Sequence, residues 1–254
     1  MVLPKNENGE HLVVYGGNGY VGSKILELAA ADGFRCSSVS RGGIAPAYLQ
    51  NSQASWLECI SWLTGNALQP DPKLLASADV VICAIGSPPV PTFTQSAFAK
   101  QLEMNGATNT AVIRAATKQS VKRLVLLGAD IPSLMKRQGF AYYLGKLQAL
   151  AAAQEFADRD PEHCVTVLQP SAIYGTRHSK RGWSIPLSPF LAPIAWLINS
   201  MPEWLRRKLP ASPVALESVA RAAVSAARDT AASGLHIIDN EQLRAISLVV
   251  LNSD

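Results

Sequence analysis

Short apolar runs alternate along the chain with stretches that carry an apolar residue every three or four positions, a pattern that predicts strands alternating with helices. The run at 79–85 is apolar almost throughout, as in a parallel strand covered by helices on both faces. The predicted strands are 12–15, 34–40, 56–62, 79–85, 121–127, 164–169 and 234–238. The predicted helices are 20–31, 74–78, 95–119, 139–159, 214–228 and a last one from 240 onwards. This order indicates an α/β fold, a doubly wound parallel sheet with a small helical C-terminal elaboration.

No linker divides the chain, so we expect one domain over 1–254, in which 176–254 contribute the part that faces a substrate or partner. The segment 183–209 is apolar, rich in proline and tryptophan, and predicts two short helices that end in a basic cluster. Its longest apolar piece, 194–198, is far too short to span a bilayer. Three roles suit such a segment: a lid over a substrate cleft, docking at a membrane surface, or docking on another protein.

Composition excludes several classes of function. The net charge of +4 and the absence of a dense basic stripe argue against a nucleic-acid partner. The four cysteines lack paired spacing and fall mostly in predicted strands, so we expect buried, reduced thiols. The four histidines are scattered, and no metal site is expected. The first ten residues have neither the apolar core of a signal peptide nor an arginine-rich presequence, so secretion is not expected.

A glycine-rich turn at 16–22 joins the first predicted strand to the first predicted helix. Gly16 permits a tight turn, Gly19 lets the backbone approach a phosphate, and Gly22 lets the helix pack close to the strand. The amide groups and the positive dipole end of the helix would then face a diphosphate. A glycine triplet alone can be merely a tight turn, but the strand before it and the helix after it favour a dinucleotide site. The predicted contacts in this turn are Gly16, Gly17, Asn18, Gly19, Tyr20, Val21 and Gly22.

The end of the second predicted strand indicates which dinucleotide binds. An NAD site places a carboxylate here for the ribose 2′-hydroxyl, whereas an arginine suits a 2′-phosphate. No acidic residue occurs in 37–43, and Ser40 is followed by Arg41, so we expect NADP(H) in preference to NAD(H). The alternative is that Arg41 is only a solvated loop residue. The further predicted cofactor contacts, at the ends of other strands and beyond, are Asn66, Ala84, Ile85, Gly86, Lys146, Pro170 and Ile173.

A Tyr-x-x-x-Lys pair supplies the candidate chemistry. Tyr142 and Lys146 are four residues apart and therefore share one helix face. An ammonium beside a phenol favours the phenolate, which would lower the pKa of Tyr142 towards working pH and suit proton transfer at a carbonyl. Lys146 would also hold the nicotinamide ribose. Asn105, which shares a helix face with Asn109, is a candidate for proton relay or positioning. The alternative is an ordinary pair on a helix surface.

These motifs together resemble the short-chain dehydrogenase/reductase family, and specifically its atypical branch. The matching stretches are 16–22, 105–109, 121–125, 142–146, 170–175, 213–220 and 234–240. That branch includes the 39-kDa accessory subunit of mitochondrial complex I and a small protein attached to the coenzyme Q biosynthesis complex. The resemblance implies a Rossmann fold, a bound dinucleotide, and a mitochondrial location on the matrix side of the inner membrane, or the cytoplasm in a bacterium.

Two departures from the family pattern concern the catalytic site. Gly128 stands where the family has a catalytic serine, and Gln169 stands where an arginine often precedes Pro170. The serine would donate a hydrogen bond to the substrate oxygen, and losing one such donor costs about 10²–10³ in rate. Ser133 is near in sequence but is not expected to replace it.

Two functions therefore stay open. In the first, the protein is an NADP(H)-dependent oxidoreductase or redox-linked isomerase that acts on an apolar carbonyl compound or quinone. In the second, the cofactor mainly stabilises the fold, and the protein is an accessory subunit of membrane-bound quinone or respiratory machinery. Gly128 favours the second function, whereas the Tyr142–Lys146 pair favours the first.

Overall fold

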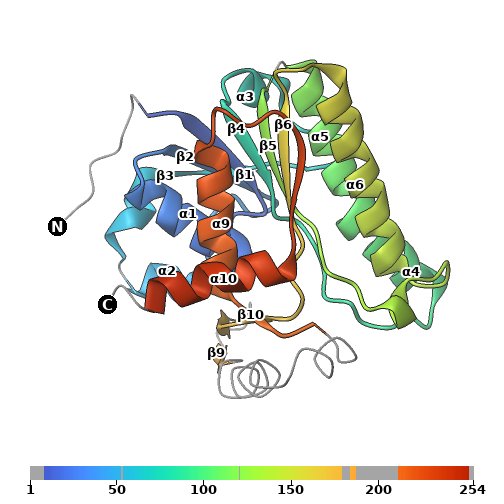
Figure 1. Cartoon of the computed structure of the whole chain (residues 1–254). Coiled ribbons are helices and arrows are strands. Elements are labelled where there is room, and N and C mark those ends of the chain that lie inside the picture. Colours follow the sequence, from blue (N-terminus) through green and yellow to red (C-terminus); the bar gives the residue numbers. More distant parts are fainter. Residues whose placement is uncertain (1–8, 53, 120, 179–183, 187–210, 252–254) are drawn as a thin grey trace.

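The computed structural model describes residues 9–52, 54–119, 121–178, 184–186 and 211–251. Its centre is a seven-stranded sheet in the order β11-β6-β5-β4-β1-β2-β3, in which every neighbouring pair is parallel (Figure 1). The strands are β1 (His11–Tyr15), β2 (Arg35–Ser40), β3 (Ile60–Thr64), β4 (Val80–Cys83), β5 (Arg123–Leu127), β6 (Cys164–Leu168) and β11 (Gly234–Ile238). The order reverses at β1, so β1 and β4 flank the switch point at which open α/β sheets bind ligands.

Helices cover both faces of the sheet. Figure 1 shows α1 and α9 on one face and α5 and α6 on the other. The helices are α1 (Tyr20–Ala31), α2 (Ala47–Ser52), α3 (Pro72–Ala76), α4 (Gln95–Leu102), α5 (Thr108–Lys118), α6 (Ala141–Arg159), α9 (Leu216–Arg228) and α10 (Asn240–Leu251). Side chains alternate along a strand, so Leu12 and Val14 pack with α1 and α9, while Val13 and Tyr15 pack with α5 and α6. The doubly wound sheet predicted from the sequence is confirmed.

Short elements complete the described residues. The pair β7 (Ile173–Tyr174) and β10 (Val214–Ala215) is parallel, and the pair β8 (Thr176–His178) and β9 (Ser184–Pro186) is antiparallel. Two 3₁₀ turns span Ser55–Cys59 and Ser133–Met135. A π-helical turn, Glu103–Ala107, joins α4 to α5.

Two predicted elements were wrong in detail. The strand expected at 56–62 is a 3₁₀ turn followed by β3. Trp56 and Cys59 are buried three residues apart, which is the spacing of a 3₁₀ turn and not the alternation of a strand. The single helix expected at 95–119 is divided into α4 and α5 by the π-turn Glu103–Ala107. The helix at 20–31 has the predicted bounds, and α2 was not predicted.

The four cysteines are buried and free, as expected. Of the segment 183–209, only β9 belongs to the described residues, so its predicted helices and docking role lie outside them. Within the described residues, no helix combines the length and the apolar character that crossing a membrane requires. The same part of the chain holds no group of three or more histidine, cysteine or acidic side chains arranged for a metal ion.

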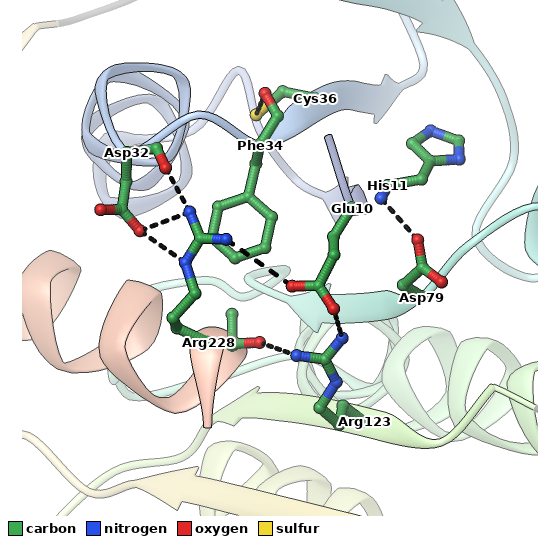
Figure 2. Close-up of polar contacts among 9 residues, drawn as sticks. Glu10, His11, Asp32, Phe34, Cys36, Asp79, Arg123 and Arg228 are labelled. Atoms are coloured by element: carbon green, nitrogen blue, oxygen red, sulfur yellow. Dashed lines mark hydrogen bonds and ion pairs between the residues drawn. The ribbon is translucent and has the colours of Figure 1, made fainter. Parts of the chain in front are cut away.

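A charged network closes the amino edge of the sheet, opposite the switch point. Figure 2 shows Glu10 between two arginines: Arg123 at the start of β5 and Arg228 at the end of α9. Arg123 also donates to the carbonyl oxygen of Ala227 at 2.6 Å, and Arg228 pairs with Asp32 at 2.9 Å. The side chain of Arg123 is only 11% exposed, so its charge needs the carboxylate of Glu10.

Glu10→Ala should therefore lower the free energy of unfolding by about 2 kcal/mol, because it leaves a nearly buried guanidinium without its counter-charge. The matched control is Glu155→Ala. This change removes an ion pair with Arg114 in which both side chains are about 60% exposed, so it should cost less than about 1 kcal/mol. Urea unfolding of both variants measures the difference. Equal losses would show that the network contributes no more than a surface ion pair.

Candidate functional site

The β1–α1 turn is built from backbone contacts that leave no room for side chains. Gly16 has φ of +89°, in the left-handed region, and a β-carbon there would lie 2.8 Å from the carbonyl oxygen of Ala84. A β-carbon at Gly22 would lie 2.3 Å from the carbonyl oxygen of Gly16. Gly19 donates its N–H to the same oxygen at 2.9 Å. The turn therefore holds the start of α1 directly against the end of β4.

The N-terminus of α1 suits an anion. Gly19 is its N-cap residue, and no side chain of the described residues caps it. The helix's hydrogen bonds begin with Ser23, whose N–H donates to the oxygen of Gly19 at 3.0 Å. The amides of Val21 and Gly22 precede that bond in the first turn, where a helix offers no intrahelical acceptor. These donors, next to glycines whose close contacts are made by backbone, fit a diphosphate.

Strand ends on both sides of β1 adjoin this turn. Gly16 donates its N–H to the oxygen of Val39 in β2 at 3.0 Å, just before the predicted contacts Ser40 and Arg41. The hydroxyl of Ser40 accepts from the N–H of Gly43 at 3.1 Å, and Arg41 is exposed. Ser40 thus shapes the loop, while the guanidinium is accessible to a ligand.

Most of the other predicted cofactor contacts lie near the β1–α1 turn, but one lies two strands away. Ala84, Ile85 and Gly86 follow β4 beside it, and Asn18 is exposed at its tip. The loop after β6, with Pro170 and Ile173, also reaches α1, since a β-carbon at Gly175 would lie 2.7 Å from the hydroxyl oxygen of Tyr20. Asn66 follows β3, two strands from β1, and its side-chain oxygen accepts from the N–H of Leu68 at 3.0 Å.

Lys146 is half-buried at the carboxyl edge of the sheet. Its ammonium donates to the carbonyl oxygen of Leu127 at 2.7 Å, and burial lowers its pKa to about 8. A β-carbon at Gly86 would lie 3.8 Å from Nζ of Lys146 and 3.1 Å from Oδ1 of Asn105. The structure thus brings the predicted residues Gly86, Asn105 and Lys146 together.

The expected effect of Lys146 on Tyr142 is wrong for this state of the protein. Burial raises the pKa of Tyr142 to about 12, instead of the ammonium lowering it. Nζ of Lys146 lies over the Tyr142 ring, 5.7 Å from its centroid, and its hydrogen bond goes to Leu127. The loss of water around the phenol therefore outweighs the neighbouring charge.

Asn105 lies in the π-turn and is fully buried. Its Nδ2 donates to the hydroxyl of Ser87 at 2.8 Å and to the carbonyl oxygen of Gln101 at 2.9 Å, and its Oδ1 accepts from the N–H of Ser87 at 3.2 Å. Both amide hydrogens are in use, which favours positioning over proton relay. Ser87 was not among the site residues predicted from the sequence. Its position directly after Gly86, at the end of a buried strand, could have indicated it.

Gly128 lies where β5 and β6 approach closely. Its N–H donates to the carbonyl oxygen of Leu168 at 2.8 Å, and a β-carbon there would lie 2.9 Å from the same oxygen. Real β-carbons essentially never approach an oxygen so closely, so a serine at this position would require the two strands to shift.

Two adjoining cavities lie at the carboxyl ends of β5 and β6. The first, of about 210 Å³, lies beside Lys146 and is lined by Tyr143 and the apolar side chains Leu126, Ile131, Leu147, Leu150 and Val167. The second, of about 270 Å³, is polar and shares Asp130 and Gln169 with the first. Among the described residues, the glycine turn lines neither cavity, so they adjoin the proposed cofactor site on the side of Lys146.

The doubly wound sheet and its glycine turn define a Rossmann-like α/β protein, and a family model agrees. Residues 12–186 match the NAD dependent epimerase/dehydratase family, and the chain belongs to that family.

Two proteins are similar to this chain in sequence. "Uncharacterized protein At1g32220, chloroplastic" of Arabidopsis thaliana is 31% identical over 242 residues, which cover 91% of this chain and 75% of the relative. "MIOREX complex component 2" of Saccharomyces cerevisiae is 27% identical over 152 residues, which cover 58% of this chain and half of the relative.

Solved structures share the fold. MoeE5, in complex with UDP-glucuronic acid and NAD, has a TM-score of 0.64 at 19% identity, covering 91% of this chain and 76% of that one. An oxidoreductase of the short chain dehydrogenase/reductase family from Burkholderia thailandensis has a TM-score of 0.61 at 15% identity, covering 97% and 98%.

Lys146→Met should stabilise the ligand-free protein by about 1–3 kcal/mol at pH 7, because it removes a buried ammonium. The pKa of Lys146 is 10.5 in the unfolded chain and about 8 in the folded protein, so the wild type gains stability as the pH rises from 8 to 10.5. The difference in free energy of unfolding between the variant and the wild type should therefore narrow over this range. Unfolding at pH 7, 8.5 and 10 measures this gap. The exposed-lysine control Lys100→Met should show no such narrowing; a pH-independent gap for Lys146→Met would contradict the burial argument.

Proposed function

We propose that this protein binds a nicotinamide dinucleotide at the β1–α1 turn and acts as an oxidoreductase on an apolar carbonyl compound or quinone. The uncapped N-terminus of α1, packed without side chains against the end of β4, is the observation that carries the proposal. It is supported by the family match and by neighbours whose structures contain NAD, including MoeE5.

Each predicted residue has a role in this proposal. The amides of the turn 16–22 hold the diphosphate, and Ala84, Ile85, Gly86, Pro170 and Ile173 flank the cofactor, with Asn66 at the outer edge. The bound nicotinamide would supply or accept the hydride. Lys146 holds the ribose, and Tyr142 gives a proton to, or takes one from, the substrate oxygen. With its pKa at about 12 in the ligand-free protein, Tyr142 is protonated and ready to donate.

The cavity beside Lys146 supports an apolar substrate. Five aliphatic side chains line it, and polar groups among its other lining residues, Lys146 included, can set the orientation of a substrate. A carbonyl oxygen directed at Lys146, with an apolar body against α6, is the pose that this lining favours.

NADP(H) is the proposed cofactor, because the end of β2 offers Arg41 and no carboxylate. NADPH should raise the Tm more than NADH does, with an affinity at least about tenfold higher, as one charge-assisted pair with a phosphate provides. Arg41→Asp should reverse this order, whereas Arg114→Asp, which changes an exposed arginine on α5, should preserve it. Thermal-shift titrations with both nucleotides decide; equal affinities in the wild type would refute the preference.

A second function, an accessory subunit with a structural cofactor, is favoured by Gly128 and by the relative that is named a complex component. In this version the segment 183–209 docks on a membrane surface or a protein complex. An organellar location, mitochondrial by the resemblance, suits both versions, and one relative is named chloroplastic.

Tyr142→Phe separates the two functions. In an oxidoreductase it should lower NADPH oxidation by a panel of quinones and ketones by about 10²–10⁴-fold, because the proton donor is lost, while the NADPH-induced thermal shift persists. Tyr48→Phe, in α2, is the matched control and should keep full turnover. A wild type that retains NADPH but oxidises it with no member of the panel would support the accessory subunit instead.

A further inference from the structure

The hydroxyl of Ser87 is held in a fixed direction at the end of β4. Asn105 makes two hydrogen bonds to Ser87: its Oδ1 accepts from the Ser87 N–H at 3.2 Å, and its Nδ2 donates to the Ser87 Oγ at 2.8 Å. Because Oγ receives that hydrogen bond, the hydroxyl hydrogen of Ser87 is left to donate elsewhere. Ser87 is only half-buried, so a ligand can reach it.

Asn105, which holds Ser87, lies where the π-turn packs closely against α6. A β-carbon at Gly145 would lie 2.8 Å from Cβ of Asn105, and one at Gly106 would lie 2.9 Å from Cα of Gly145. The π-turn and α6 therefore approach each other closely at these two glycines. Lys146 directly follows Gly145, so this single contact positions both Asn105 and Lys146. Single π-turns inside helices occur frequently at functional sites.

Ser87 directly follows a stretch of backbone that lies close to Lys146. Nζ of Lys146 would lie 3.8 Å from a β-carbon at Gly86, the residue before Ser87. The same Nζ lies 5.7 Å from the ring centroid of Tyr142. The ammonium is thus near both the backbone that leads into Ser87 and the phenol.

We propose that Ser87 donates the hydrogen bond to the substrate oxygen that a serine at position 128 would otherwise donate. Gly128 has no side chain to supply this donor, and a β-carbon there would lie 2.9 Å from the carbonyl oxygen of Leu168. The proposal rests on the oxidoreductase function above. It assigns Ser87 as a catalytic residue and Asn105 as the positioning residue that directs it.

The reaction balances with these groups. Hydride transfer from NAD(P)H forms a C–H bond at the carbonyl carbon and moves the π-electron pair onto the oxygen. Tyr142 gives its proton to that oxygen, and an O–H bond forms. Ser87 keeps its proton throughout and stabilises the negative charge while it develops.

A thiol at this position tests the environment without substrate or cofactor. The native cysteines provide a silent background, because all four are buried, and burial raises the pKa of Cys36 and of Cys83 to about 12. In Ser87→Cys, the rate of iodoacetamide labelling against pH gives the thiol pKa. We expect it about one unit below the ordinary 8.5, because the amide of Asn105 and the ammonium of Lys146 favour the thiolate.

Ser96→Cys, at an exposed position on α4, is the matched control with an ordinary thiol. Adding Asn105→Leu to Ser87→Cys should return its thiol pKa to the control value. A thiol at position 87 that titrates at or above the control would overturn the proposal.

Turnover tests the role itself. With NADPH and 1,4-naphthoquinone as the probe, Ser87→Ala should lower kcat about 10²-fold and leave the NADPH thermal shift unchanged, whereas Ser96→Ala should change neither. Ser87→Ala at wild-type kcat would overturn the assignment and leave the oxidoreductase function standing. A wild type that binds NADPH but does not reduce the probe would refute both together.

Discussion

The contact of Gly16 with the carbonyl oxygen of Ala84 is the constraint on which the site depends. In a parallel sheet, β1 and β4 end at the same edge, but a helix can begin there only if the intervening turn lies flat against its neighbour. Here the turn does so because it has no β-carbons at the points of contact. The donors of α1 are thereby fixed relative to the backbone that follows β4.

Hydrogen bonds and close packing connect the backbone after β4 to the candidate catalytic residues. Asn109 donates to the carbonyl oxygen of Ile85 at 3.1 Å, and Asn105 holds Ser87 two residues further on. The π-turn that carries Asn105 packs on Gly145 beside Lys146. The proposed diphosphate site at the β1–α1 turn and the proposed substrate site beside Lys146 are therefore connected through β4 and the loop after it. Surface side chains contribute little to this connection.

Much of the fold could be predicted from local pattern, since buried parallel strands and amphipathic helices have distinct periods. The helix at 20–31 and the strand at 234–238 have the predicted bounds. The 3₁₀ turn at Ser55–Cys59 and the π-turn were missed, because their hydrogen bonds join residues three and five apart and leave no separate period in so short a stretch. The role of Ser87 was missed because its partner Asn105 is 18 residues away, and local pattern does not show a contact over that separation.

The electrostatics of the site could not be predicted from the spacing of Tyr142 and Lys146. Spacing shows that the two share a helix face, but burial decides their pKa values, and here it leaves Lys146 easier to deprotonate and Tyr142 harder. A buried ammonium destabilises the ligand-free fold, and a bound anion or hydroxyl would offset that cost whether the cofactor is catalytic or structural. Lys146 therefore fits both functions equally. Ser87, which Asn105 holds by two hydrogen bonds, favours the oxidoreductase, because a structural cofactor requires only the donors of α1.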